Sequence, residues 1–341
     1  MFGESDNSAI KADITVTFEA PKIGHLIYPG KEYTGILKIV KIGIPKNIVE
    51  EGVSTRTYMN CKQSKSLFKN RPLNSHKGLF GKVFCLTGSQ NYQGAVTLVL
   101  EGALHSGAGL LTSCYKENLS NILSQRVIPE ATHCPIGVVN GKYTDKSSID
   151  FGNTKNPVMC IGSGIGRDLD VQMFVKRLYG SIDYTMVIDA DALYAIKDDL
   201  NKSTRSIKVL TPHIGEMSYL TDISKKDIQR DLVKTALVFA KKWNSFVVLK
   251  SATTVIASPN GEAFINYFGS SALAKGGSGD VLAGTIAGYL AQGYTPMNAS
   301  ILSVTIHSIA AQIMEEKETS WCSSILNLPK YYAEAIRKIL N

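Results

Sequence analysis

The sequence predicts an α/β fold with a mostly parallel central sheet that is covered by helices on both faces. Its strand-like runs, such as KVFCLTG at 82–88, are continuously apolar, which is typical of strands buried on both faces. From Gly81 onward these runs alternate with helix-like segments. Small and polar residues cluster where several of the runs end, and in parallel sheets ligands bind beyond the carboxyl ends of the strands. We therefore expect the glycine-rich motifs to converge on one crevice.

Composition and charge narrow the classes of function. The 341 residues are 44% hydrophobic and 19% charged, as in a globular protein with a core. The net charge is +8, but the basic residues are scattered and the densest cluster, at 225–230, lies on a predicted solvated helix face. This pattern argues against a nucleic-acid partner and suits a phosphorylated small-molecule substrate.

Cysteine usage and hydropathy predict a cytoplasmic protein. Cys85 and Cys160 lie within apolar runs and no CxxC motif is present, which favours core thiols in a reducing compartment. The first residues, MFGESDNS, do not resemble a signal peptide. No apolar run approaches the roughly 18 residues of a membrane span, so we expect no membrane partner.

Residues 1–49 differ from the rest of the chain. Strands are predicted at 13–21 and 35–45, with turns between them at the Pro and Gly residues of 21–30. Two strands do not make a core alone. The segment is therefore either an extension packed on the main domain or the tail of a domain whose front is missing, and its exposed strand edges favour self-association into a homo-oligomer.

Residues 50–341 form the predicted main domain. The polar stretch 50–77 predicts a helix followed by a loop. Beyond it, strands are expected at 82–88, in 157–168, at 185–193, within 207–217, at 246–258 and, as a hairpin partner, at 262–268. Helices are expected at 95–109, 227–244, 280–292, 297–316 and 329–340. Small residues in the first of these helices, Gly102 among them, allow close packing.

The stretch around Asp280 predicts a phosphoryl-transfer site. Gly276, Gly277 and Gly279 let backbone N–H groups crowd around a ligand, and the start of the following helix suits a phosphate. A carboxylate at that place repels an anion, but Asp280 can act as a base for a hydroxyl proton beside an arriving phosphoryl group. The alternative is that Asp280 caps the helix.

Two further motifs leave alternatives open. Gly162-Ser163-Gly164-Ile165-Gly166 could be a dinucleotide-binding turn with Asp189 as the ribose acid, although its spacing is GxGxG rather than GxGxxG. It could also be a plain tight turn, or a turn that lines a substrate in another α/β fold. Asp189 and Asp191 could contact substrate or a hydrated Mg²⁺, or Asp191 could cap a helix.

Two polar clusters follow later strands. In Thr211–Glu216, His213 is predicted to contact a ligand, and Glu216 either holds the waters of Mg²⁺ or caps a helix. In Lys250–Thr254, Lys250 offers a charge for phosphate and the small side chains let the backbone approach a nucleotide; the alternative is a simple β-turn. GxxxxGK[ST] is absent, which argues against a P-loop enzyme.

Six motifs occur together in a specific order: GSQNYQGA, GSGIGRD, DADAL, TPHIGE, KSATT and KGGSGDVLAG. As a set they resemble the ADP- or ATP-dependent NAD(P)H-hydrate dehydratases, whose fold is the ribokinase-like three-layer α/β/α arrangement. The resemblance covers about 50–341. Residues 1–49 resemble the last stretch of an NAD(P)H-hydrate epimerase domain without its front, which leaves room for a separate epimerase chain as partner.

The resemblance implies a site and a reaction. It implies that the hydrated nicotinamide nucleotide contacts Ala95, Gly164 or Gly166, His213 and Asp280. It places the adenine nucleotide on Lys250, Ser251, Ala252, Thr253, Thr254, Gly276, Gly277 and Gly279.

The implied enzyme is a hydro-lyase of cofactor repair that acts on the S-epimer of NAD(P)H hydrate. Asp280 would take the ring hydroxyl proton, the oxygen would attack the terminal phosphoryl group of the nucleotide, and phosphate would then leave. Mg²⁺ would assist, and ADP is the expected donor over ATP. The competing hypotheses are a ribokinase-like vitamin or sugar kinase, and a chain that binds nucleotides or a partner without catalysis.

Overall fold

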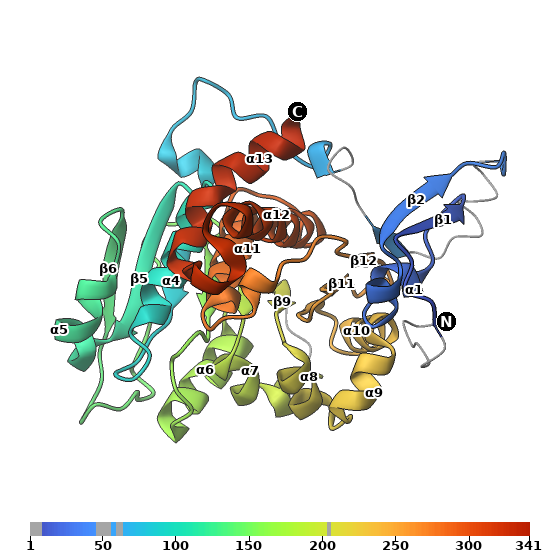
Figure 1. Ribbon diagram of the computed structural model, residues 1–341. Helices are drawn as coiled ribbons and strands as arrows, with labels where there is room; N and C mark the ends of the chain where they lie inside the picture. The colour runs from blue at the N-terminus through green and yellow to red at the C-terminus, as the bar shows by residue number, and fades with distance from the viewer. Residues whose placement is uncertain (1–8, 46–55, 59–63, 203–205) are drawn as a thin grey trace.

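A ten-stranded sheet forms the centre of the protein in the computed structural model (Figure 1). The structure describes residues 9–45, 56–58, 64–202 and 206–341. In spatial order the strands are β3 (Arg56–Tyr58), β12 (Ala263–Ile265), β11 (Val255–Ala257), β10 (Phe246–Leu249), β9 (Lys208–Leu210), β8 (Thr185–Ile188), β7 (Val158–Ile161), β4 (Lys82–Leu86), β5 (Leu110–Lys116) and β6 (Ala131–Ile136). Among the described strands of this sheet, only β11 pairs antiparallel, with β10 and β12. The predicted mostly parallel sheet is confirmed.

Helices cover both faces of this sheet, and each face has its own apolar core (Figure 1). One face carries α4 (Gly94–His105), α11 (Ser278–Ala291), α12 (Pro296–Cys322) and α13 (Tyr332–Leu340). The other carries α6 (Leu169–Ser181), α7 (Asp191–Ala195), α8 (Ile214–Thr221), α9 (Lys225–Arg230) and α10 (Leu232–Lys242). Cys85 and Cys160 are fully buried in the first core, as predicted.

Short helical segments complete the connections of the main domain. They are η2 (Lys77–Phe80), η3 (Glu117–Leu119), α5 (Ser120–Leu123), η4 (Ser124–Arg126), η5 (Lys197–Asp199), η6 (Ser271–Leu273) and η7 (Ile325–Tyr331).

Close contact between α4 and α11 fixes the helix that carries Asp280. A Cβ at Gly102 would lie 2.1 Å from the carbonyl oxygen of Val281, and one at Gly284 would lie 2.0 Å from that of Val99. The two backbones approach this closely only because neither glycine has a side chain. The predicted role of small residues in close packing is confirmed at Gly102.

The N-terminal segment packs on the edge of the main domain. Its predicted strands are β1 (Ile14–Phe18) and β2 (Ile36–Val40), which pair in parallel as a separate two-stranded sheet. The chain between them forms α1 (Ile23–Leu26) and η1 (Gly30–Tyr33) rather than turns alone. Leu26 and Ile27 join the core on the α8 and α10 side. The domain boundary at 49 stays a prediction, because residues 46–55 lie outside the described ranges.

Three predicted elements are wrong in part. Within the helix predicted in 50–77, Arg56–Tyr58 are a strand that pairs with β12, and residues 50–55 and 59–63 lie outside the described ranges. The strand predicted at 246–258 is two antiparallel strands, because the chain reverses at 250–254. The helix at 227–244 is divided at Asp231, whose side chain accepts the N–H of Lys234 and so starts a new helix.

Helix α12 corrects the expectation that no segment approaches the length and hydropathy of a membrane span. Its most apolar 18-residue window has a mean hydropathy of 1.2. However, 83% of that window is buried inside the protein. The burial of α12 is therefore that of a core helix in a folded domain, and α11 and α13 pack against it.

Candidate active site

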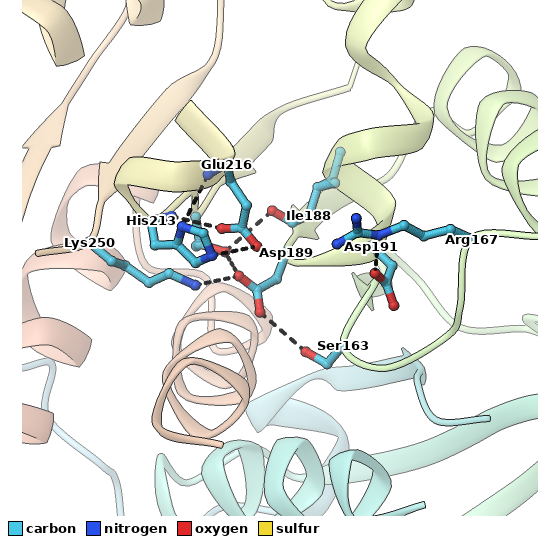
Figure 2. A network of polar contacts seen from close by, with 9 residues as sticks. Ser163, Arg167, Ile188, Asp189, Asp191, His213, Glu216 and Lys250 are labelled. Carbon is cyan, nitrogen blue, oxygen red and sulfur yellow. Dashed lines mark hydrogen bonds and ion pairs between the residues drawn. The ribbon is translucent and has the colours of Figure 1, made fainter. Parts of the chain in front are cut away.

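The carboxyl ends of three neighbouring strands bring charged side chains together beside the start of α11 (Figure 2). Asp189 follows β8, His213 follows β9 and Lys250 follows β10. His213 and Lys250 extend the parallel pairing of their strands by one bridge. The predicted convergence of the motifs at one edge of the sheet is confirmed for these residues.

Asp189 and Lys250 form a buried ion pair at the centre of this cluster. Nζ of Lys250 lies 2.7 Å from Oδ1 of Asp189. The same oxygen accepts the Thr211 hydroxyl at 2.6 Å, and Oδ2 accepts the Ser163 hydroxyl at 3.3 Å. Burial lowers the pKa of Lys250, but the carboxylates of Asp189 and Glu216 outweigh it and raise the pKa above its ordinary value. Lys250 is therefore charged at neutral pH.

Asp280 stands in the first turn of α11, next to this cation. The N-cap of the helix is Gly277, with φ 93°, and a Cβ at Gly279 would lie 3.0 Å from Nζ of Lys250. Burial raises the pKa of Asp280 to about 6, and the charge of Asp189 adds to that effect. The N-cap position belongs to Gly277, and within the described part of the chain no side-chain hydrogen bond caps α11, so the alternative that Asp280 is simply the helix cap is wrong.

His213 and Glu216 form a capping box at the start of α8. Nδ1 of His213 accepts the N–H of Glu216 at 3.0 Å, and Oε2 of Glu216 accepts the N–H of His213 at 2.8 Å. The capping role of Glu216 is therefore confirmed, while its role toward Mg²⁺ stays a prediction. Burial and Lys250 lower the pKa of His213, which favours the neutral ring. Because Nδ1 accepts a hydrogen bond, that ring has its proton on Nε2, which lies 3.6 Å from Oε1 of Glu216.

The 162–167 segment is a tight turn that Asp191 holds in place. A Cβ at Gly162 would lie 1.8 Å from the carbonyl oxygen of Asp189, so only glycine fits there. Asp191 accepts the N–H of Gly166 at 3.0 Å and Nε of Arg167 at 2.7 Å. The N-cap of α7 is Ala190, so the capping role considered for Asp191 is wrong. Asp191 instead stabilises the 162–167 turn through these two bonds.

Ala95 and Gly164 meet between α4 and this turn. A Cβ at Gly164 would lie 3.1 Å from that of Ala95, which is itself buried. Beside them a cavity of about 700 Å³ is lined by Gly88–Tyr92 on one side and Ile165–Asp168 on another. Its volume suits a drug-sized or larger ligand. Of the residues predicted to touch substrate, Gly166 lines this cavity, and the contacts predicted for Ala95, Gly164, His213 and Asp280 stay predictions.

The 250–254 turn connects β10 and β11. The Ser251 hydroxyl donates to the carbonyl of Thr253 at 2.6 Å and accepts the N–H of Thr253 at 3.2 Å. The side chain of Thr253 is buried and donates to the carbonyl of Leu26 at 3.1 Å. Lys250 thus points into the charged cluster, whereas the Thr253 side chain points toward the N-terminal segment.

The fit of the site to Mg²⁺ can be judged from its carboxylates. Among the residues that the structure describes, no three His, Cys, Asp or Glu side chains gather as a metal cage. Asp189 and Glu216 already accept hydrogen bonds from protein groups. Such a site fits a Mg²⁺ ion that keeps its waters and takes phosphate oxygens as ligands.

Sequence reasoning missed Ser163, whose hydroxyl joins Asp189 and lowers the pKa of Asp280 through a hydrogen bond. It lies within the predicted turn, but only the packing of β7 against β8 brings it to these carboxylates. A lone polar residue between glycines at a strand end was the one available signal.

Comparison with known proteins places the chain in a family. The family model described as NAD(P)H-hydrate dehydratase matches residues 83–331. A bifunctional NAD(P)H-hydrate repair enzyme from Moorella thermoacetica is 35% identical over 90% of this chain, and the chain spans 59% of that relative's length.

A single-function relative and a crystal structure, both from Bacillus subtilis, extend the comparison. An ADP-dependent (S)-NAD(P)H-hydrate dehydratase is 32% identical over 73% of this chain and 87% of its own length. A crystal structure of an ADP/ATP-dependent NAD(P)H-hydrate dehydratase, co-crystallised with ATP and Mg²⁺, matches 83% of this chain and 98% of its own with a TM-score of 0.69 and 27% identity. The predicted ribokinase-like fold is confirmed, and the chain belongs to the NAD(P)H-hydrate dehydratase family.

Proposed function

We propose that this chain dehydrates the S-epimer of NAD(P)H hydrate to NAD(P)H at the expense of ADP or ATP. The observation that carries the proposal is Asp280, a half-buried carboxyl with a pKa raised to about 6, at the N-terminus of α11 beside Lys250. A general base works best when its pKa lies near the working pH. An ordinary surface aspartate would be a weaker base for a hydroxyl proton.

The surroundings of Asp280 support phosphoryl transfer. The positive end of the α11 helix dipole and the ammonium of Lys250 favour negative charge in front of the helix. Asp280 is then the proton acceptor, while its neighbours stabilise charge that develops on the transferring phosphoryl group.

In the proposed sequence the ring hydroxyl of the hydrate loses its proton to Asp280, and its oxygen bonds to the terminal phosphorus of the donor. The bond from that phosphorus to the bridging oxygen of the donor breaks, which leaves AMP from ADP or ADP from ATP. Phosphate is a better leaving group than hydroxide, so the carbon–oxygen bond then breaks. Loss of a proton from the neighbouring ring carbon restores the dihydropyridine.

His213 and the 162–166 turn would position the ring. The side chain of His213 is 57% exposed, and its Nε2 lies 3.6 Å from Oε1 of Glu216. This distance is longer than a hydrogen bond, so the Nε2–H can donate to a ligand oxygen. Mg²⁺ would neutralise charge on the donor phosphates, with Glu216 as an acceptor for its waters. We infer ADP as the donor from the name of the single-function relative; the name of the crystallised relative admits both nucleotides.

The direct test is an assay with hydrated NADH or NADPH, Mg²⁺ and either ADP or ATP, in which recovery of absorbance by the reduced cofactor is followed. We expect recovery with at least one donor and release of one phosphate per cofactor. A stable phosphorylated product without recovery would indicate a kinase instead. Failure with both donors and both cofactors would refute the proposal.

Asp280→Asn tests the proposed base. We expect turnover to fall by about 10²- to 10⁴-fold, the usual contribution of general base catalysis, with nucleotide affinity retained. Calorimetric titration with ADP gives the second quantity without any need for turnover. Wild-type turnover in the Asn variant would remove Asp280 from the mechanism.

We also propose that the chain is cytoplasmic and associates through its N-terminal sheet, either with itself or with a separate epimerase chain. On β1 the side chains of Ile14, Val16 and Phe18 are 49%, 55% and 57% exposed on one face. Light scattering of the purified protein would show self-association as a mass above 37.0 kDa.

A further inference from the structure

The segment Ile23–Tyr33 lies against the turn that is proposed to bind the donor nucleotide. Leu26 and Ile27 are buried in the core beside α8 and α10. The neighbouring residues Tyr28, Pro29 and Glu32 line a cavity of about 410 Å³ together with Ser251–Thr253. Residues more than 200 positions apart in the chain thus face each other across the outer side of the 250–254 turn.

Two polar contacts tie the segment to this region. The hydroxyl of Thr253, which is 1% exposed, donates to the carbonyl oxygen of Leu26 at 3.1 Å. The ammonium of Lys31 donates to the carbonyl oxygen of Tyr267 and lies 4.9 Å from the centre of the Tyr267 ring. Burial lowers the pKa of Lys31 to about 8.

These two contacts lie at the two ends of the segment 253–267, which is proposed to lie beside the donor nucleotide. Thr253 belongs to the turn itself, and Tyr267 follows β12, on the path to the Gly276–Gly279 loop. The two places are linked because Asn266 donates its N–H to the carbonyl of Thr254 at 2.9 Å. On the inner side of the same turn, Lys250 reaches Asp189 and Gly279.

We propose that the segment Ile23–Tyr33 is a positioning element of the donor site, which holds the 250–254 turn in the conformation that binds the nucleotide. The inference rests on the proposed function for the identity of the ligand. It gives the N-terminal segment a role in the dehydratase reaction itself. Loss of its contacts lowers the affinity for ADP or ATP and leaves the hydrate site unchanged.

The first test is Thr253→Val, which keeps the shape of the side chain and removes the donor to Leu26. We expect the Kd for ADP, measured by calorimetry, to rise about three- to tenfold, as for the loss of one hydrogen bond. The KM for the donor should rise equally, whereas the KM for the hydrate stays within about twofold. Thr253→Ser restores the hydroxyl and should recover the affinity.

The second test removes the other contact, between Lys31 and Tyr267. Lys31→Met removes the ammonium from Tyr267 and keeps most of the apolar stem, so it should weaken ADP in the same way. Lys41→Met is the matched control, because Lys41 pairs with Glu19 in the N-terminal segment away from the turn; its Kd for ADP should equal that of the unchanged protein.

The outcomes separate this inference from the proposed function. Unchanged ADP affinity in folded Thr253→Val and Lys31→Met proteins would overturn the positioning role. A loss of kcat with unchanged donor KM would overturn it too, because that result indicates a smaller active fraction. If the unchanged protein binds ADP but does not restore NAD(P)H, the proposed function fails while the titrations still decide the positioning role. If the unchanged protein binds neither ADP nor ATP, both fail.

Discussion

Nζ of Lys250 lies 2.7 Å from Oδ1 of Asp189, whose side chain is only 2% exposed. This pair joins the ends of β8 and β10 across β9. It also sets the charge of the site, because Asp189 raises the pKa of Asp280 while Lys250 lowers it. The ion pair therefore has both a structural and an electrostatic role.

Lys250→Met is expected to destabilise the protein by about 3–5 kcal/mol, because it leaves the buried carboxylate of Asp189 without its cation. Urea unfolding measures this change. Lys317→Met is the matched control, since the pair of Lys317 with Glu334 is about half exposed and such pairs contribute about 1 kcal/mol at most. Equal effects of the two substitutions would contradict the structural role of the buried pair.

The pH dependence of turnover should report Asp280. A base must be ionised to accept a proton, and burial raises the pKa of this carboxyl to about 6. We therefore expect kcat/KM to fall about tenfold per pH unit below that value. Initial rates between pH 5 and 8 check this expectation, and a flat profile down to pH 5 would contradict it.

Asp280→Asn should also change the pH dependence of stability. The folded-state pKa of Asp280 lies above the ordinary aspartate value of 3.8, so its contribution to stability is present below 3.8 and is lost as the pH rises through about 6. The Asn variant cannot ionise and avoids this loss. Its Tm should exceed that of the unchanged protein by more at pH 8 than at pH 5, and a constant difference would argue against a raised pKa.

Gly284→Ala should destabilise the protein although alanine favours helices. The added Cβ meets the carbonyl oxygen of Val99 at 2.0 Å, so α4 and α11 must separate, at a cost of about 1–3 kcal/mol. Gly180→Ala in α6 is the control, since no atom of the described residues lies within 4 Å of its Cβ position; it should stabilise by roughly 0.5–1 kcal/mol. Thermal unfolding of both variants distinguishes the two effects.

Glu216→Gln separates the two roles of this residue. The amide oxygen can still accept the N–H of His213, so the capping box of α8 and the Tm should change little. If Glu216 also holds the waters of Mg²⁺, the Mg²⁺ concentration for half-maximal turnover should rise by about tenfold or more. An unchanged Mg²⁺ dependence would leave Glu216 with the capping role alone.

Much of the fold was readable from the sequence because its signals are local. The apolar run of β4, the glycines before α11 and the alternation of β1 each determine a conformation within a few residues. The prediction was wrong where tertiary contacts determine the secondary structure. Arg56–Tyr58 form a strand because they pair with β12. Likewise, the strand expected at 246–258 is divided because Ser251 and Thr253 close a turn within it.

By itself the sequence determined which residues lie at strand ends and at the start of α11, because hydrophobic periodicity and turn-forming residues act within short segments. Only the tertiary structure decided what those residues do to one another. Asp189 proved to be the partner of Lys250, Asp191 the brace of the 162–167 turn, and Thr253 a contact of Leu26. These roles depend on distances between segments far apart in the chain, and the raised pKa of Asp280 follows from the burial and the charges that those distances create.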